Sequence, residues 1–328
     1  MIAARVEQQI PTLDDVHAAR RRIAPHLQPT PLYPYGALNE LVGTEIFVKH
    51  ENHLPTGAFK VRGGVNLVSQ LSEDERRRGV VTASTGNHGQ SIAFAAGRFG
   101  VRAIVCVPEE ANPVKLAAME QLGAELVVHG RDFDEAREHC EQLASEHGYR
   151  YVHSGNEPLL IAGVATETLE ILEEQPQTDV IVVPVGGGSG AAGACIVAKA
   201  INPAIRIIGV QSEAAPAAFR SWQDRRLVVD RMQTVAEGLA TRTAFELPQR
   251  ILWQWLDAFV LVSDDEILRA QTLMIEATRN LVEAAGAAPL AAGLRLRERL
   301  AGQRVALILS GGNASREQLL EAVGTSKR

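Results

Sequence analysis

Short apolar runs alternate with amphipathic stretches along most of this chain. After a first run at residues 45–49, the runs form two series, which cover 80–83, 102–107, 125–129 and 150–153, and then 179–185, 205–210, 258–262 and 304–309. The segments between them have helical spacing, and one of these places Ile92, Ala95, Ala96 and Phe99 on a single face. Alternation of this kind predicts parallel strands joined by crossover helices. We therefore expect an α/β fold with parallel-type sheets flanked by helices.

The two series differ, which indicates two lobes. Strands of the second series are almost continuously apolar, so they are expected to be buried on both faces of their sheet. We expect a small α/β lobe over residues 78–150, inserted into a large lobe built from residues 1–77 and 151–328. With 46% hydrophobic residues in 328, the chain can bury a large core, which excludes a disordered or fibrous protein.

Charge and composition exclude several classes of partner. The 33 Lys and Arg against 39 Asp and Glu give a net charge of −6 without a long run of either sign, so no nucleic acid is expected. No segment reaches the roughly 20 apolar residues that cross a bilayer, so no membrane is expected either. Cys106, Cys140 and Cys195 stand far apart and are expected to be small core residues in a reducing compartment. A soluble cytoplasmic protein is the expectation.

Three loops follow predicted strands, where open α/β sheets bind their ligands. The first is Thr85-Gly-Asn-His-Gly-Gln90, in which unpaired amides at the start of the next helix would bind an anion. The second, Gly186-Gly-Gly-Ser-Gly190, lets the backbone approach a ligand closely and favours a phosphate. The third, Ser310-Gly-Gly-Asn313, presents a hydroxyl at the carboxyl end of a strand.

The second loop also fits a dinucleotide fingerprint. Gly188, Gly190 and Gly193 have the G-x-G-x-x-G spacing, and Glu213 follows about 20 residues later, near the end of the next strand. An NAD-dependent dehydrogenase is therefore an alternative from another class. It leaves the other two loops and the segment 49–64 unexplained.

One lysine within that segment has an unusual setting. Most lysines are solvated surface charges, but Lys60 follows Ala58 and Phe59 and precedes Val61. Apolar surroundings disfavour the ammonium form and lower the pKa of a lysine towards that of a nucleophile. Lys60 is therefore the candidate reactive amine.

Three histidines are expected to have structural roles. His50 and His53 form a His-x-x-His pair without the helix and glutamate of a zinc protease, so a metal site is the weaker interpretation. His88 is expected to belong to the hydrogen-bond network of its loop. Together, a buried lysine, a glycine cradle, an anion-binding loop and a neutral hydroxyl suggest pyridoxal 5'-phosphate.

Seven motifs occur in a characteristic order. They are Pro29-Thr-Pro-Leu32, Thr56-Gly-Ala-Phe-Lys-Val-Arg-Gly63, Gly86-Asn-His-Gly-Gln90, Pro184-Val-Gly-Gly-Gly188, Ala236-Glu-Gly238, Val282-Glu-Ala-Ala-Gly286 and Ser310-Gly-Gly-Asn313. By these motifs the chain, from about Pro11 to Asn313, resembles the threonine dehydratase and serine racemase family of fold-type II pyridoxal-phosphate enzymes. The resemblance implies a two-lobed fold similar to the tryptophan synthase β subunit, and a homodimer.

The resemblance also implies roles for the loop residues. Lys60 would form the Schiff base, Asn87 would touch the ring hydroxyl and Ser310 would meet the pyridine nitrogen. The remaining residues implied for the cofactor are Phe59, Gly186, Gly187, Gly188, Ser189, Gly190 and Glu283. The amides that would bind the substrate carboxylate are those of Ser84, Thr85, Gly86, Asn87 and His88. Lys60, Thr85 and Ser310 are the implied catalytic residues.

The implied chemistry is β-elimination from a β-hydroxy amino acid such as L-threonine or L-serine. The neutral hydroxyl of Ser310 makes the cofactor ring a weak electron sink, which favours elimination over transamination. Lys60 would act as the general base at Cα, and the enamine product would hydrolyse to a 2-oxo acid and ammonium. Thr85 occupies the position of the second catalytic serine of the racemases, so racemisation is a possible side activity.

Several departures from the family pattern bear on metal and substrate. Gln211 and Ala217 replace the acidic residues of the family's divalent-cation site, so no metal is expected. Ala58 replaces a serine, and residues 161–166 replace a Gly-Gln-Gly-Thr ending. The variant motifs are similar to those of hydroxyectoine-utilisation dehydratases, so a modified hydroxy amino acid is an alternative substrate. A catalytically silent ligand-binding relative is the third alternative.

Overall fold

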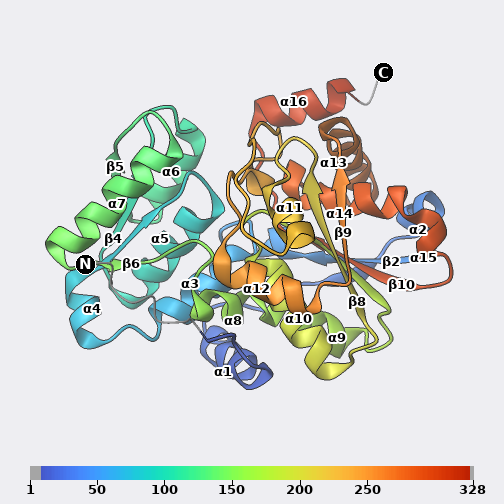
Figure 1. Cartoon of the computed structure of the whole chain (residues 1–328), viewed down its shortest axis with the longest axis horizontal. Coiled ribbons are helices and arrows are strands. Elements are labelled where there is room, and N and C mark those ends of the chain that lie inside the picture. Colours follow the sequence, from blue (N-terminus) through green and yellow to red (C-terminus); the bar gives the residue numbers. More distant parts are fainter. Residues whose placement is uncertain (1–8, 326–328) are drawn as a thin grey trace.

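Two sheets, one in each half of the molecule, form the framework of the computed structural model (Figure 1). The structure describes residues 9–325, and the other residues of the predicted large lobe, 1–8 and 326–328, lie outside this part. The larger sheet contains, in spatial order, β1 (Leu32–Pro34), β2 (Glu45–His50), β10 (Arg304–Leu309), β7 (Val180–Pro184), β8 (Arg206–Ser212) and β9 (Ala258–Val262). The smaller contains β5 (Glu125–Val128), β4 (Ala103–Val107), β3 (Val80–Ala83) and β6 (Arg150–Tyr151).

The predicted strands are all present, and the α/β class is confirmed. Neighbouring strands pair in parallel, apart from β1, which pairs with β2 in the antiparallel direction. The prediction missed β1 because this strand has three residues and no apolar run, and its Tyr33 is half exposed.

Helices cover both faces of the larger sheet. Along β7, Ile181 and Val183 pack into one core cluster, and Val180 and Val182 pack into the cluster of the opposite face. The predicted burial on both faces is therefore confirmed. The helices of the first cluster are α1 (Leu13–Ile23), α8 (Pro158–Val164), α9 (Thr166–Glu174), α10 (Ser189–Ile201), α11 (Ala217–Asp224) and α12 (Glu246–Trp255). Those of the second are α2 (Gly36–Val42), α13 (Asp264–Thr278), α14 (Ala284–Arg295) and α15 (Arg297–Leu300), and α16 (Arg316–Thr325) packs on α13.

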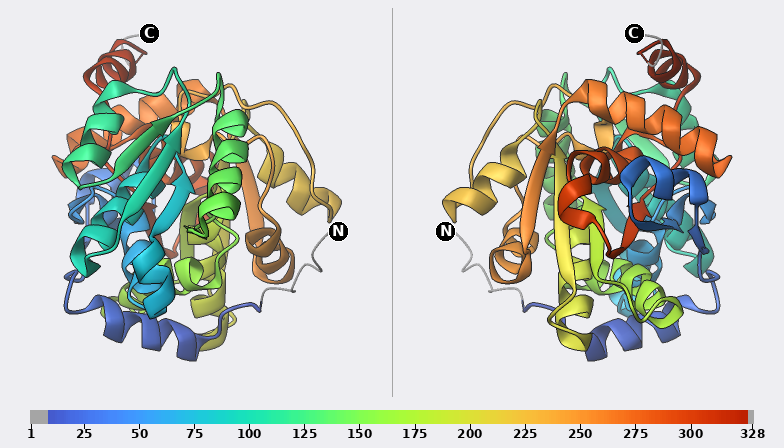
Figure 2. Two further views of the ribbon diagram at one scale, coloured as in Figure 1. Left: turned by 90° about the vertical axis from the view of Figure 1, so that its left-hand side faces the viewer. Right: turned by 90° about the vertical axis from the view of Figure 1, so that its right-hand side faces the viewer.

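The smaller sheet also lies between helices, with α6 (Pro113–Gln121) and α7 (Phe133–His147) on opposite faces (Figure 2). Cys106 of β4 and Cys140 of α7 are buried under one face, and Cys195 is buried in α10. All three are free thiols in the core, as predicted. The predicted lobe boundary at residue 150 falls within β6, which pairs with β3. We keep the two lobes, with β6 assigned to the smaller one, as a proposal.

Helix α3 (Lys60–Val68) joins the two halves of the molecule. It packs against α5 (Asn87–Phe99), which follows β3, and against α8. A Cβ atom on Gly64 would lie 2.3 Å from Oγ of Ser91 in α5, and one on Gly63 would lie 2.9 Å from the carbonyl oxygen of Leu160 in α8. The backbones approach so closely that only glycine fits at these positions. The remaining elements are α4 (Glu73–Arg78) and the short 3₁₀ helices Glu51–His53 and Glu237–Leu239.

Within residues 9–325, none of the helices combines the length and the apolar character that a membrane crossing requires.

Candidate active site

The three predicted loops meet at one cavity of about 670 Å³. They follow β3, β7 and β10, so the cavity lies at the carboxyl ends of strands from both sheets. Every predicted site residue lines it, namely Phe59, Lys60, Ser84, Thr85, Gly86, Asn87, His88, Gly186, Gly187, Gly188, Ser189, Gly190, Glu283 and Ser310. Residues that are far apart in the sequence are thus brought to one site.

Lys60 is the first residue of α3, and its amine is directed towards the glycine loop. Its Nζ donates hydrogen bonds to Oγ of Ser189 at 2.7 Å and to the carbonyl oxygen of Ser154 at 3.3 Å. Nζ also lies 5.1 Å from the centre of the Phe59 ring. Burial lowers the pKa of Lys60 to about 8, although the charge of Glu167 opposes this shift. A useful fraction of Lys60 is therefore a free amine near neutral pH.

The glycine loop, residues 186–190, is a cradle of unpaired amides at the start of α10. In the described part of the chain, no acceptor takes the amides of residues 186–191. A Cβ atom on Gly187 would lie 2.2 Å from the Phe245 ring, and one on Gly186 would lie 2.1 Å from the carbonyl oxygen of Gly238. Gly188 has a φ of +88°. The loop therefore requires glycine, and its amides, together with the helix dipole, favour a phosphate.

The loop after β3 offers fewer amides than the sequence suggested. The Ser84 amide donates to the carbonyl oxygen of Cys106, and the Gly86 amide donates to Oγ of Ser84. Among the described residues, the amides of Thr85, Asn87 and His88 have no acceptor. Ser84 therefore shapes the loop through its hydroxyl, and three amides remain for a carboxylate.

A chain of side-chain amides and one acid forms another wall of the cavity. Asn87 donates from Nδ2 to Oε1 of Glu283 at 2.9 Å, and it accepts at Oδ1 from Nδ2 of Asn313 at 2.8 Å. Asn313 also donates to the carbonyl oxygen of Thr56. Burial raises the pKa of Glu283. Asn313 had no predicted role, although its place at the end of the Ser-Gly-Gly-Asn motif was a signal for one.

Ser310 is buried beside the segment that holds Lys60. The Phe59 amide donates to the carbonyl oxygen of Ser310 at 3.0 Å, and the Gly312 amide donates to that of Gly57 at 2.9 Å. The loop that presents the Ser310 hydroxyl is therefore hydrogen bonded to the segment that presents the amine.

The histidines have the structural roles that were predicted for them. His88 is buried and shares a 2.9 Å hydrogen bond through Nε2 with Oγ1 of Thr82, while burial lowers its pKa to about 3. His50 is hydrogen bonded to the Tyr35 hydroxyl and stacks on His53. No group of three or more potential metal ligands occurs within residues 9–325.

The dinucleotide alternative does not fit the site. Glu213, which would bind a ribose hydroxyl, forms a 3.2 Å ion pair with Arg295 and does not line the cavity. A Cβ atom on Gly193 would lie 2.8 Å from Cα of Ala165, so this glycine serves helix packing.

Comparison with known proteins decides between these alternatives. Residues 23–311 match the family described as pyridoxal-phosphate dependent enzyme. The chain belongs to this family.

Relatives within the pyridoxal-phosphate-dependent family match nearly the whole chain. An L-threonine ammonia-lyase of Thermotoga maritima is 38% identical over 92% of this chain and 75% of its own length. An L-threo-3-hydroxyaspartate ammonia-lyase of Saccharomyces cerevisiae is 35% identical over 93% of this chain and 94% of its own. The crystal structure of serine racemase from Dictyostelium discoideum has a TM-score of 0.88 and 35% identity, and covers 93% of this chain and 99% of that chain. The predicted resemblance and the fold-type II architecture are therefore confirmed.

The residues present fit pyridoxal phosphate, the cofactor of this family. The unpaired amides of residues 186–190 suit its phosphate, and the cradle has no room for larger side chains there. Lys60 suits its aldehyde, and Ser310 supplies a neutral hydroxyl. The amides would hold the phosphate through hydrogen bonds and the helix dipole, Lys60 would form the covalent bond, and Ser310 would contribute a hydrogen bond.

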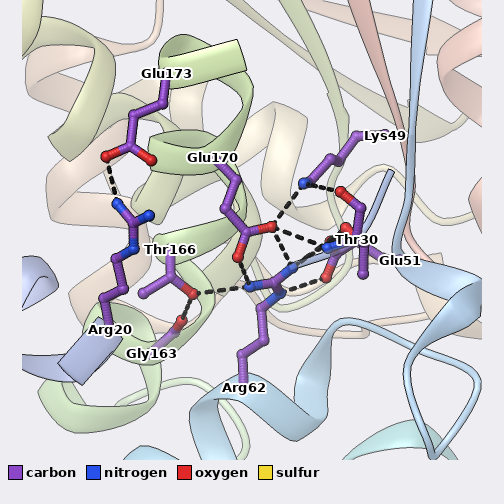
Figure 3. Close-up of polar contacts among 9 residues, drawn as sticks. All are labelled: Arg20, Thr30, Lys49, Glu51, Arg62, Gly163, Thr166, Glu170 and Glu173. Atoms are coloured by element: carbon purple, nitrogen blue, oxygen red, sulfur yellow. Dashed lines mark hydrogen bonds and ion pairs between the residues drawn. The ribbon is translucent and has the colours of Figure 1, made fainter. Parts of the chain in front are cut away.

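Two features near the site were not predicted. One is a buried cluster that we call the ion network, which consists of Lys49, Glu51, Arg62 and Glu170 (Figure 3). Its Arg62 pairs with Glu51 at 2.7 Å and with Glu170 at 2.6 Å, and Lys49 pairs with Glu170 at 2.6 Å. The partners come from distant parts of the sequence, and no motif signals their pairing.

The other feature is at the mouth of the cavity. Lys115 of α6 pairs with Glu237, and Asp134 of α7 lies 3.5 Å from Arg242. These contacts join α6 and α7, which cover the smaller sheet, to the segment between α11 and α12. Glu237 begins a short 3₁₀ helix and Arg242 follows it in a segment without regular structure, so the sequence pattern did not predict these contacts.

Proposed function

We propose that this pyridoxal-phosphate-dependent enzyme is an ammonia-lyase. It would convert a β-hydroxy amino acid of the threonine or serine type into a 2-oxo acid and ammonium. The observation that carries the proposal is the amine of Lys60, which lies in one cavity with the amide cradle at 186–190 and the free amides of Thr85, Asn87 and His88. The ammonia-lyases among its relatives support the same reaction class.

The residues of the cavity have separate roles in this reaction. The amides of Thr85, Asn87 and His88 orient the substrate carboxylate at the start of α5. Lys60, as a free amine, takes the proton from Cα and passes it to the β-hydroxyl, which leaves as water, so that Lys60 is again a free amine. The bound cofactor supplies the electron sink that makes this proton acidic. The released enamine then takes up water and gives the 2-oxo acid and ammonium.

The test is a panel of L-serine, L-threonine and L-threo-3-hydroxyaspartate, assayed for 2-oxo acid with the cofactor-loaded enzyme. We expect turnover of at least one of them, and a Lys60 peptide that carries the mass of the reduced cofactor after borohydride treatment. If the cofactor binds at Lys60 and all three substrates fail, the plain dehydratase proposal is wrong and the modified hydroxy amino acid becomes the substrate to test.

Racemisation is the second candidate activity, and Thr85 supports it. Thr85 is half-buried in the cavity wall, and a serine racemase is among the structural relatives. We expect wild-type enzyme to form some D-serine from L-serine and the Thr85→Ala variant to form none, while both release pyruvate.

We also propose that the enzyme is a cytoplasmic homodimer. The dimer is implied by the family resemblance, and the reducing compartment by the three free, buried cysteines. Light scattering of the purified protein would show a mass of twice 35.4 kDa.

A further inference from the structure

Glu167 is a buried acid near the active site that no step above uses. It lies in the first turn of α9 with 1% of its surface exposed. Its Oε2 has no hydrogen-bond partner in the described part of the chain. A buried carboxyl without a partner destabilises a fold, so its presence needs an explanation.

The carboxyl of Glu167 reaches the back of the glycine loop. A Cβ atom placed on Gly190 would lie 3.5 Å from Oε1 of Glu167 and 3.2 Å from the Phe59 ring. Phe59 directly precedes Lys60, and the amine of Lys60 donates to Ser189, the neighbour of Gly190. The acid and the amine therefore approach the same short segment of the loop, with Phe59 beside both.

The ion network leaves Glu167 without a counter-ion. That network contains two cations and two carboxylates, which pair with each other. Burial raises the pKa of Glu167 well above its ordinary value, and the charges of Glu51 and Glu170 add to this, while Arg62 and Lys49 lower it. Both cations of the network are already paired, and the charge of Glu167 acts in turn on Lys60, whose pKa it raises against the effect of burial.

We propose that Glu167 is a positioning residue for Lys60. The two side chains are not in contact but together bind one proton, and Glu167 thereby sets the fraction of Lys60 present as the free amine. In one state Lys60 is an ammonium and Glu167 a carboxylate. In the other state both are neutral. The proposal rests on the proposed function only in taking Lys60 as the reactive amine.

The coupling acts through charge. The hydrogen bonds of Nζ of Lys60 go to Ser154 and Ser189, so Glu167 does not orient the amine by direct contact. Two interacting groups of this kind titrate as a pair. When Lys60 takes a proton from a substrate, a carboxylate at 167 stabilises the ammonium. When Glu167 is protonated, this stabilisation is lost, which favours the free amine of Lys60 for the next cycle.

Two histidines near the pair do not change charge in the working range, and Glu283, whose pKa is raised by burial, lines the same cavity and is unchanged in every variant compared below. Burial lowers the pKa of His88 to about 3 and that of His153 to about 4, so both are neutral above pH 6. At the cavity mouth, Lys115 pairs with Glu237 and Arg242 lies by Asp134. The titration of Lys60 between pH 6 and 10 therefore reports on Glu167.

The experiment measures the titration of Lys60 in the cofactor-free protein. Trace labelling with acetic anhydride from pH 6 to 10, followed by mass spectrometry of the Lys60 peptide, gives the midpoint of its reactivity. In Glu167→Gln we expect this midpoint to fall by about one pH unit or more, because the ammonium loses its counter-charge. Glu167→Asp should keep a midpoint closer to that of the wild type. The matched control is Glu173→Gln, on the exposed face of the same helix and paired with Arg20 (Figure 3), and it should leave the midpoint unchanged.

Glu167→Leu is measured in parallel, because it removes the acid without leaving a buried amide to satisfy. We expect the same downward shift. An unchanged midpoint in either folded variant, as judged by near-ultraviolet circular dichroism, would overturn the proposal. The proposed function is tested separately by the borohydride-reduced adduct of pyridoxal phosphate at Lys60 in wild-type protein. A shifted midpoint without an adduct contradicts the function alone, and an adduct with an unshifted midpoint contradicts the proton pair alone.

Discussion

Lys49, which is fully buried, and Lys60, which is half-buried in the cavity wall, have opposite surroundings. The amine of Lys49 is fully buried and lies 2.6 Å from a carboxylate oxygen of Glu170 and 2.6 Å from the carbonyl oxygen of Thr30. The amine of Lys60 contacts a hydroxyl and a carbonyl oxygen, both uncharged, and its pKa is lowered to about 8. Burial alone therefore does not make a lysine reactive. Lys60 is reactive because no carboxylate bonds its half-buried amine directly. The amine of Lys49, in contrast, forms an ion pair that stabilises its charge.

The largest effect is expected when the reactive amine is removed. Lys60→Ala should lose activity by about 10⁴-fold, because the general base and the covalent anchor disappear together. Its apparent melting temperature should fall only slightly, because the amine loses two hydrogen bonds, and Glu167, whose pKa is raised by burial, is then protonated. Initial rates of 2-oxo acid release and a thermal scan measure both quantities. A variant that keeps a hundredth of the activity would show that another group is the base.

A change in the ion network should act on stability instead. Arg62→Met leaves Glu51 without its cation and weakens the pairing of Glu170, which should cost about 3–5 kcal/mol of unfolding free energy. Urea unfolding measures the loss. Arg20→Met, which removes the exposed pair with Glu173, is the control and should cost at most about 1 kcal/mol. Equal losses of unfolding free energy in the two variants would contradict the view that the buried ion network stabilises the fold more than an exposed ion pair does.

The glycine cradle gives a smaller and more local effect. In Gly187→Ala the new methyl group would lie 2.2 Å from the Phe245 ring, so the loop must shift. We expect this shift to cost about 1–3 kcal/mol. We expect cofactor affinity, measured by titration of the visible absorbance, to fall about 10-fold to 100-fold. Gly36→Ala has open space around the new methyl group and should bind the cofactor as the wild type does.

The pH dependence sharpens the comparison further. Because the pKa of Lys60 is about 8, the rate of cofactor uptake by the cofactor-free protein should rise about tenfold per pH unit up to that value and then level off. Between about 8 and the ordinary 10.5, the unfolded chain binds a proton that the folded chain does not. The contribution of Lys60 to stability therefore rises with pH through this window. Stopped-flow absorbance would reveal a levelling point near 10 if Lys60 were an ordinary surface amine.

The smallest effect is expected from divalent cations. By the family resemblance, Gln211 and Ala217 replace acidic cation ligands, and Oε1 of Gln211 accepts the amide hydrogen of Phe219. Magnesium added to metal-stripped enzyme should therefore leave the rate unchanged. A rise in activity would contradict this prediction.

Local pattern was sufficient for most of the fold. Apolar runs predicted β2 to β10, because most of these strands are buried between the helices that cover their sheets. The same reasoning missed β1, which is short and exposed and owes its place to pairing with β2. The three loops could be assigned to one site because parallel strands bring their carboxyl ends to a common edge.

The sequence did not show that Lys49 and Lys60 have different surroundings. Lys49 follows Phe47 and Val48, so its neighbours are as apolar as those of Lys60. What distinguishes it is Glu170, more than a hundred positions away and brought close by the packing of α9. Glu167 and the contacts at the cavity mouth were missed for the same reason, because they depend on tertiary packing rather than on local spacing.

The close contacts of α3 have a consequence for protein engineering. Gly63 and Gly64 do not line the cavity, yet a methyl group at either would force α8 or α5 away from α3. Helix α3 begins with Lys60, and Ser91 of α5 donates a hydrogen bond to the carbonyl oxygen of that same residue. Directed evolution of substrate range would therefore gain more from libraries at the irregular loops around the opening than from any that include these two glycines.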